Sequence, residues 1–256
     1  MSLEGRVALV TGGGRGIGRA ISMGLAEDGA AVAVNYRRDE DAAHEAVAAI
    51  EAAGGRAKAY HASVDSFEED QAMVEAILKD FGHVDILVNN AGIASRGQSV
   101  ADTDPAEMER VVRTHAFGPH YLSKLVLPSM REQPRGDIVM ISSAATKNFA
   151  GNGAPYNMGK AAMEALALTL YKEERKNSIH VNIVAPGLVE TEMGKRLARA
   201  TTGVQDIHEL DARSPFSRVC QPEDIANVVR FVVSDRAGYV TGERIYVDGG
   251  GNLFNY

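Results

Sequence analysis

The chain has few of the features that mark secreted, membrane-embedded or nucleic-acid-binding proteins. It holds one cysteine, Cys220, so no disulfide can form within the chain, and we expect a buried or idle thiol. The first apolar run, Val7 to Val10, is too short for a signal-peptide core or a membrane span. A formal net charge of −7 gives no basic excess that would attract nucleic acid. These absences favour a cytoplasmic protein that binds neither nucleic acid nor a membrane.

Short apolar runs alternate with helical patterns along most of the 256 residues. Such alternation predicts a parallel sheet that is covered by helices on both faces. We expect strands at 6–10, 31–34, 57–62, 85–88, 137–141, 180–184 and 244–247. We expect helices near 17–28, 40–53, 67–80, 105–131, 155–176 and 222–233.

Right-handed crossovers turn this pattern into a doubly wound α/β sheet, with ligands at the carboxyl ends of the strands. We find no repeat and no linker, so we expect one domain over residues 1–256. The stretch at about 187–220 breaks the rhythm and holds a helical piece at Thr191–Thr202. A long insertion after a strand is a natural place for a substrate lid.

The first strand leads directly into a glycine-rich stretch, residues 11–18, and then into a helix. Glycines at this place let backbone N–H groups approach a pyrophosphate, which sits at the positive end of the helix. A glycine cluster alone also occurs in tight turns. Its position between strand and helix favours dinucleotide binding.

Tyr156 and Lys160 lie one turn apart on a predicted helix and therefore share a face. A nearby ammonium stabilises a phenolate, lowers the pKa of the tyrosine and makes it a plausible acid or base. Ser143 ends a buried strand, where its hydroxyl can donate to an oxygen that gains negative charge. The alternative is an ordinary surface pair of tyrosine and lysine.

Six motifs occur in an order that resembles the short-chain dehydrogenase/reductase family. They are TGGGRGIG, Asn89-Asn90-Ala91-Gly92, Ser143, Tyr156-x-x-x-Lys160, Pro186-Gly187 and the terminal VTGERIYVDGG. The resemblance extends from about Gly5 to Gly250, and within the family it is strongest to 3-oxoacyl-[acyl-carrier-protein] reductase-like members. It implies a Rossmann-type fold of about seven strands and hydride transfer with a nicotinamide cofactor.

The resemblance also implies which residues hold the cofactor. The pyrophosphate turn would consist of Gly12, Arg15, Gly16, Ile17 and Gly18. The adenine amino group would be bound by Asp65. The adenosine and ribose would be lined by Asn89, Ala91 and Gly92. The nicotinamide would be covered by Pro186, Gly187 and Thr191. We expect no metal.

Charge favours NADP(H) over NAD(H), with NAD(H) kept as the alternative cofactor. Family members that use NAD place an acidic residue after the second strand, where this chain has Tyr36 followed by Arg37 and Arg38. Guanidinium groups bind a 2′-phosphate, and Arg15 can face the same phosphate. Alternatively, this is a solvated basic turn balanced by the acids at 39–41.

In the implied mechanism Tyr156 transfers the proton, and Ser143 holds the substrate oxygen. Lys160 lowers the pKa of the tyrosine and binds the nicotinamide ribose. Ser142 is the other candidate serine, but the family interval of thirteen residues before the tyrosine selects Ser143.

One position departs from the family. Where family members usually have an asparagine that anchors a water in the proton relay, this chain has His115. The histidine either takes over the relay, since it titrates near neutral pH, or fills the helix kink with its ring bonded to the backbone. We expect a change to asparagine to preserve or raise turnover and to alter the pH profile.

The expected function is reduction of a carbonyl, either a 3-ketoacyl thioester or a small ketone. The alternatives are an alcohol, sugar or steroid dehydrogenase that works in the oxidative direction, and a non-catalytic NADP-binding sensor. Candidate substrate contacts lie at 94–96, 147–152 and 187–220. A partner such as acyl-carrier protein, or CoA as the acyl carrier, would place the protein in fatty acid biosynthesis. A basic patch for that partner would consist of Arg131, Arg135, Lys172, Arg175 and Lys176, unless these are ordinary solvated helix ends.

The resemblance further implies a homotetramer. It would form through the long helices near 105–131 and 155–176, and through the region of the C-terminal strand. The tail at 252–256 is apolar enough to dock on a neighbouring subunit.

Overall fold

Seven strands form one parallel sheet in the computed structural model, which describes residues 2–251. The strands are β1 (Val7–Val10), β2 (Ala31–Tyr36), β3 (Ala57–His61), β4 (Ile86–Asn89), β5 (Gly136–Ile141), β6 (Ile179–Pro186) and β7 (Arg244–Val247). Their order in the sheet is β3-β2-β1-β4-β5-β6-β7, which confirms the expected doubly wound architecture. The order reverses between β1 and β4, where such sheets bind their ligands. The tail at 252–256 lies outside the described residues.

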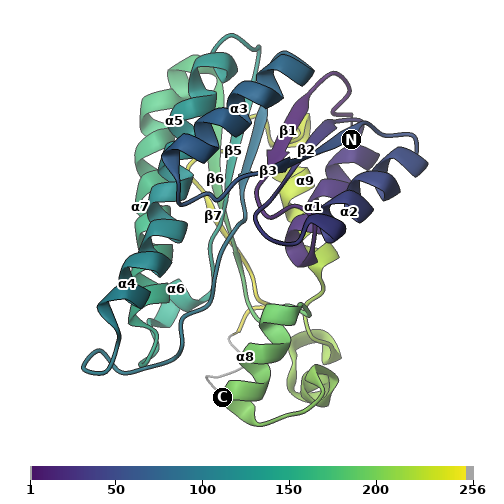
Figure 1. The fold of residues 1–256 in the computed structure, drawn as a ribbon. Helices are drawn as coiled ribbons and strands as arrows, with labels where there is room; N and C mark the ends of the chain where they lie inside the picture. The colour runs from purple at the N-terminus through teal and green to yellow at the C-terminus, as the bar shows by residue number, and fades with distance from the viewer. Residues whose placement is uncertain (1, 252–256) are drawn as a thin grey trace.

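The longer helices cover both faces of this sheet (Figure 1). On one face lie α1 (Gly16–Glu27), α2 (Glu40–Ala52) and α9 (Pro222–Val232). On the other lie α3 (Phe67–Phe81), α5 (Gly118–Met130) and α7 (Ala154–Glu174). Towards the carboxyl ends of the strands lie α4 (Pro105–Val112), α6 (Ala145–Asn148) and α8 (Glu192–Thr202). Over residues 2–251, no helix combines the length and the apolarity that crossing a membrane requires.

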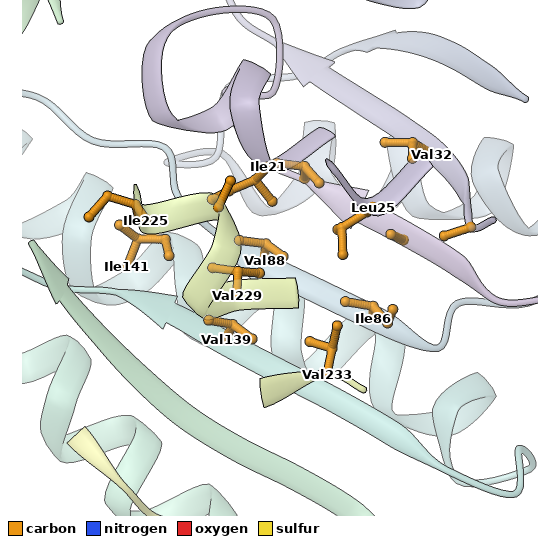
Figure 2. Close-up of a cluster of buried hydrophobic side chains, with 14 of the residues drawn as sticks. Ile21, Leu25, Val32, Ile86, Val88, Val139, Ile141, Ile225, Val229 and Val233 are labelled. Atoms are coloured by element: carbon orange, nitrogen blue, oxygen red, sulfur yellow. The ribbon is translucent and has the colours of Figure 1, made fainter. Parts of the chain in front are cut away.

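Two apolar cores result because strand residues alternate between the faces of the sheet. Within β1, Ala8 and Val10 face the α1 and α9 side, and Leu9 faces the α3, α5 and α7 side. Figure 2 shows the first core, in which Ile21 and Leu25 of α1 meet Val229 of α9 over the strands. Burying one such side chain contributes about 1.5–3 kcal/mol, so the sheet forms a rigid base for its loops.

The region 105–131, expected as one helix, is divided into three pieces. A π-helical turn over Arg113–Phe117 separates α4 from α5. Pro119 explains the interruption, because its nitrogen carries no hydrogen to donate to the carbonyl of His115, as an α-helix would require. The other expected helices and the strands agree with the structure to within about two residues.

One buried carboxyl group is a conspicuous exception in the second core. Asp70 of α3 is fully buried, and neither of its oxygens has a hydrogen-bond partner within residues 2–251. Burial raises the pKa of this carboxyl to about 8. The folded protein therefore keeps Asp70 protonated at neutral pH, whereas the unfolded chain ionises it.

This difference predicts how Asp70→Asn changes stability. Because the folded pKa is raised, the folded state becomes less stable as pH rises from about 4 to about 8, by up to about 1.4 kcal/mol per unit. The asparagine side chain of the variant cannot ionise, so the gain in unfolding free energy over wild type should grow across this range. Denaturant unfolding at pH 5, 6.5 and 8 measures it. The same change at the exposed Asp41 is the control, and an equal gain at all three pH values would contradict the prediction.

Candidate active site

The loop between β1 and α1 forms a glycine cradle at the switch point. Gly12 and Gly16 have φ angles of 60° and 52°, a region that favours glycine. At Gly18 a Cβ atom would lie 2.1 Å from the Gly12 carbonyl oxygen, so no side chain fits there. Arg15 stands at the N-cap of α1 without a side-chain cap among the described residues. The first N–H groups of α1 therefore remain available to an anion, which fits the expected pyrophosphate.

Polar residues at the ends of three strands fix this cradle. Thr11 accepts hydrogen bonds from the backbone N–H groups of Asn90 and Ala91, both at 2.9 Å, through its hydroxyl oxygen. The Asn90 side chain donates back to the Thr11 carbonyl at 2.8 Å. Asn35 accepts from the Gly12 N–H at 3.2 Å. Sequence reasoning missed the three side chains of Thr11, Asn35 and Asn90, although each is polar and ends or follows a buried run.

The neighbouring predicted residues lie around the same turn. Ile17 is half-buried against the core, and the buried Asn89 places its amide nitrogen 3.3 Å from the Met140 sulfur. A Cβ atom on Gly92 would lie 2.6 Å from the His115 ring. A side chain at position 92 would therefore clash with this ring, which gives a second reason for a glycine here besides the turn after β4.

Two ion pairs hold the arginines expected at the adenosine end. Arg15 pairs with Asp39 at 3.5 Å, and Arg37 pairs with Asp65 at 3.8 Å. Asp65 also accepts the Ser63 hydroxyl at 2.5 Å. The fold thus gathers Arg15 of the glycine turn with Arg37 and Asp65, which follow β2 and β3. The Arg15 side chain is 74% exposed and the Arg37 side chain 40%.

The two residues that flank Arg37 are also at this edge. The Tyr36 hydroxyl donates to Glu40 at 3.1 Å, and its ring meets the His61 ring edge-on at 5.4 Å. Arg38 is exposed. The alternative was a solvated basic turn whose charge is balanced by the acids at 39–41. One of these acids, Asp39, also accepts a backbone hydrogen bond as the N-cap of α2.

Ser143, Tyr156 and Lys160 come together where β5 ends against α7. The Ser143 hydroxyl lies close enough to the Tyr156 phenol to lower its pKa. The Ala145 N–H donates to the Ser143 hydroxyl oxygen at 3.1 Å. Lys160 donates to the Ile141 carbonyl at 2.7 Å, and its nitrogen lies 5.8 Å from the centre of the Tyr156 ring. This arrangement has a proton donor, a hydrogen-bond donor and a buried cation around one point.

The pKa directions in this group differ from the simplest expectation. Burial raises the pKa of the Tyr156 phenol, and the Ser143 hydrogen bond opposes that effect. Burial lowers the pKa of Lys160 to about 7, opposed by the negative charge of Glu164. In this structure the ammonium is bonded to a carbonyl, and it does not produce the lowered tyrosine pKa that we expected.

The two serines are clearly distinguished. Ser142 is buried, and its hydroxyl donates to Glu164 at 2.5 Å, whereas Ser143 is half-buried and meets Tyr156. Ser142 therefore has a partner of its own in the protein interior. Glu164 is a further residue that sequence reasoning missed, although it stands one turn after Lys160 on the same face.

His115 occupies the π-helical turn beside the tyrosine. Its Nε2 lies 2.8 Å from the Ile93 carbonyl, and its ring meets the Tyr156 ring edge-on at 5.2 Å. Its Nδ1 is buried without a partner in the described part of the chain. Burial, with Lys160 nearby, lowers the pKa of His115 to about 3. The ring is therefore neutral at neutral pH, unlike the near-neutral titration expected from the sequence.

The segment after β6 reaches both parts of the site. Pro186 accepts the Ala144 N–H at 2.7 Å, and Gly187 donates to Val247 at 3.0 Å. Thr191 caps α8 and lies 3.2 Å from the position of a Cβ atom on Gly16. The expected helical piece is confirmed as α8. The rest of the 187–220 segment contains two 3₁₀ helices, Ile207–Arg213 and Pro215–Ser217, and a small apolar core of its own.

Several residues expected at the surface prove to be tied to the scaffold. Arg135 forms a bidentate pair with the buried Asp137, and Arg131 pairs with Glu174. These two arginines are therefore not free members of the expected basic patch. In the expected substrate contacts, Arg96 pairs with Glu107, and Lys147 pairs with Asp248. The lone thiol, Cys220, is half-buried, and burial raises its pKa to about 12.

A known family and several named proteins are similar to this chain. The family described as enoyl-(acyl carrier protein) reductase matches residues 12–252. An uncharacterized oxidoreductase of Methylorubrum extorquens is 39% identical, covering 97% of this chain and 98% of the relative. Versicolorin reductase 1 of Aspergillus parasiticus is 37% identical, covering 97% of both chains. A 3-oxoacyl-[acyl-carrier-protein] reductase of Synechocystis is 36% identical, covering 99% of both.

Two solved structures share the fold over nearly their whole length. A 7α-hydroxysteroid dehydrogenase complexed with NADH and 7-oxo glycochenodeoxycholic acid has a TM-score of 0.91 and 34% identity, covering 98% of this chain and 96% of the other. The angucycline C-6 ketoreductase LanV with bound NADP has a TM-score of 0.88 and 34% identity, covering 97% and 96%.

His115→Asn tests the role of the histidine. Because the ring is neutral and bonded to a backbone carbonyl, we expect the change to preserve kcat or to raise it by no more than about threefold. The pH profile of kcat should lose no titration above pH 5. Steady-state rates between pH 5 and 10 measure this. His120→Asn on α5 is the control for the chemical change. A drop of more than about 100-fold with the fold intact would show that His115 takes part in proton transfer.

Proposed function

The chain belongs to the short-chain dehydrogenase/reductase family, and we propose that it is a reductase that uses NADPH to convert a ketone into an alcohol. The proposal rests on one observation above the others. Ser143, Tyr156 and Lys160 meet at the carboxyl ends of the strands, next to the glycine cradle. The bound nicotinamide would supply the hydride. The protein would supply the proton and the alignment of the substrate.

In the proposed reaction the substrate carbonyl oxygen is held between Ser143 and Tyr156. Ser143 accepts the Ala145 N–H through its oxygen, and its hydroxyl hydrogen, which faces Tyr156, would turn to the substrate carbonyl. Tyr156 has a raised pKa and is protonated at neutral pH, as a general acid must be. As negative charge develops on the carbonyl oxygen, the phenol gives up its proton, and the serine hydrogen bond strengthens.

Lys160 would stabilise the phenolate that remains. Its pKa of about 7 means that charged and neutral forms are both populated near neutral pH. The ammonium form favours loss of the Tyr156 proton and can also bind ribose hydroxyls. His115 would support the kink against which the tyrosine packs, either as a purely structural ring or through its unpartnered Nδ1.

The cofactor preference follows from charge at the ends of β2 and β3. Arg37, Arg38 and Arg15 are exposed there, and β2 ends on Tyr36 instead of being followed or ended by an acid at this position. A 2′-phosphate would take these guanidinium groups from their long ion pairs with Asp39 and Asp65. Among the similar structures LanV was solved with NADP and the hydroxysteroid dehydrogenase with NADH, so NADH is the alternative.

The substrate class follows from the relatives more than from the site. Two relatives are named 3-oxoacyl-[acyl-carrier-protein] reductase and versicolorin reductase, and the two candidates are a 3-ketoacyl thioester and a small ketone. A carrier-protein partner would use the exposed Lys172, Arg175 and Lys176, because Arg131 and Arg135 are paired. The 187–220 segment would close over the substrate as a lid.

We further propose that one domain, residues 1–256, assembles into a homotetramer in the cytoplasm. A hollow of about 390 Å³ lies on the face of α5 and α7, lined by Ala116, Phe117, His120, Tyr121 and Leu166. Phe117 is 47% exposed, which suits a contact with another subunit. Met163, Ala167 and Leu170 of α7 pack into the second core instead. Sedimentation equilibrium of the whole chain measures the assembly.

Initial rates of NADPH and NADH oxidation over a panel of ketones, including a 3-ketoacyl thioester, test the activity. Tyr156→Phe should lower kcat about 100-fold or more, because no proton donor remains, while NADPH affinity changes less than about threefold. The exposed Tyr239→Phe is the control. Tight cofactor binding without turnover of any ketone or alcohol would instead favour the sensor. Turnover only of alcohols with NADP⁺ would favour the oxidative direction.

Arg37→Ala tests the cofactor preference. Loss of a guanidinium group that binds phosphate should lower the ratio of kcat/KM for NADPH to that for NADH by about 10- to 100-fold. Parallel kinetics with both cofactors measure the ratio. Lys79, which is exposed in the last turn of α3, is the control, and its removal should leave the ratio unchanged. An unaltered ratio in Arg37→Ala would mean that this arginine does not read the 2′-phosphate.

A further inference from the structure

A buried carboxylate lies directly behind the candidate catalytic residues. Glu164 is 3% exposed and follows Tyr156 and Lys160 at intervals of four residues, so the three side chains share one face of α7. Its Oε2 pairs with Arg244 of β7 at 2.7 Å. Its Oε1 accepts hydrogen bonds from Ser142 at 2.5 Å and Thr146 at 2.9 Å. A buried charge with this number of partners is firmly held in place.

The two hydroxyl partners of Glu164 lie on either side of Ser143. Ser142 immediately precedes it, and Thr146 belongs to the turn that follows. The Thr146 hydroxyl is shared between Glu164 and the Ser143 carbonyl, which it meets at 2.8 Å. Glu164 therefore fixes the backbone before and after Ser143. It contacts the reacting group only through its neighbours.

Glu164 also acts on the charge of Lys160. Burial disfavours the ammonium form, and the negative charge one turn away favours it. Tyr156 on α7 and His115 on the π-helical turn are the other titratable groups that face Lys160, and His115 is neutral. Arg244 of β7 faces Glu164 from the opposite side and keeps its charge paired. Within the described residues, Glu164 is thus the nearby anion that supports the lysine.

We propose that Glu164 is a positioning residue of this active site, which holds Ser143 in place through Ser142 and Thr146 and favours the ammonium form of Lys160. Arg244 anchors it to β7, so the last strand of the sheet takes part in aligning the site. The inference rests on the proposed reductase function for its kinetic readout. It adds Glu164 and Arg244 to the proposed active site as residues that act through their neighbours and not by contact with substrate or cofactor.

Three variants separate the two roles of Glu164. Glu164→Gln keeps a hydrogen-bond acceptor for Ser142 and Thr146 but removes the charge, whereas Glu164→Leu removes both. We expect Glu164→Gln to move the alkaline limb of kcat about one pH unit lower, because Lys160 loses its proton earlier. Glu164→Leu should in addition lower kcat by about 10- to 100-fold, because Ser143 is displaced. Glu164→Asp, which keeps the charge, should restore most of the pH profile.

Glu174→Gln is the matched control. Glu174 lies on the same helix, is 2% exposed and is paired with an arginine, Arg131. It stands ten residues further on, about 15 Å along α7. We expect its variant to lose thermal stability and to retain the wild-type kcat and pH profile. A purely structural role for Glu164 would give the two glutamine variants the same behaviour.

The titration of Lys160 gives a second readout that needs no turnover. Carbon-13 labelling of the lysine side chains, with Lys160→Met to assign the signal, gives its midpoint by NMR. The midpoint should be lower in Glu164→Gln than in wild type and unchanged in Glu174→Gln. If wild type reduces no ketone, the proposed function fails, and this titration still decides the inference. An unshifted Lys160 together with an unchanged kcat profile would overturn it.

Discussion

A lysine ammonium buried beside the proposed catalytic tyrosine is the constraint on which this site depends. Removing a cation from water is costly unless polar partners replace the water. Here the Ile141 carbonyl accepts its hydrogen bond, and Glu164 supplies negative charge one turn away. The carbonyl is within reach because α7 packs against β5 and β6, whereas Glu164 belongs to the same helix as the lysine. The position of Lys160 is therefore set by the sheet and the helix together.

The same packing accounts for the histidine that departs from the family. The His115 side chain lies between two glycines. A Cβ atom placed on Gly92 would lie 2.6 Å from the His115 ring, and one placed on Gly159 would lie 2.9 Å from the Cβ atom of His115. The π-helical turn created by Pro119 places the histidine beside Tyr156. The glycine at 92 thus makes room for a ring that is larger than an asparagine side chain, whereas the glycine at 159 makes room for the Cβ atom of residue 115.

Parallel strands explain why the cofactor residues gather despite their separation in the chain. Every strand of a parallel sheet ends at the same edge, so the side chains of Thr11, Asn35 and Asn90 meet around one turn. They fix the backbone of the glycine cradle, and Thr191 from the 187–220 segment touches the cradle as well. The proposed cofactor would therefore lie between this edge of the sheet and the segment proposed as a substrate lid.

The sequence by itself determined the fold class, the strand positions and the glycine turn, and it nominated Ser143, Tyr156 and Lys160, which the structure brings together. These features depend on local periodicity and on short motifs, which survive without knowledge of contacts. Only the tertiary structure decided the pairing of Glu164 with Arg244, the neutral state of His115 and the unpartnered burial of Asp70. Each of these depends on desolvation and on partners that are distant in sequence, and no local pattern encodes the distance between them.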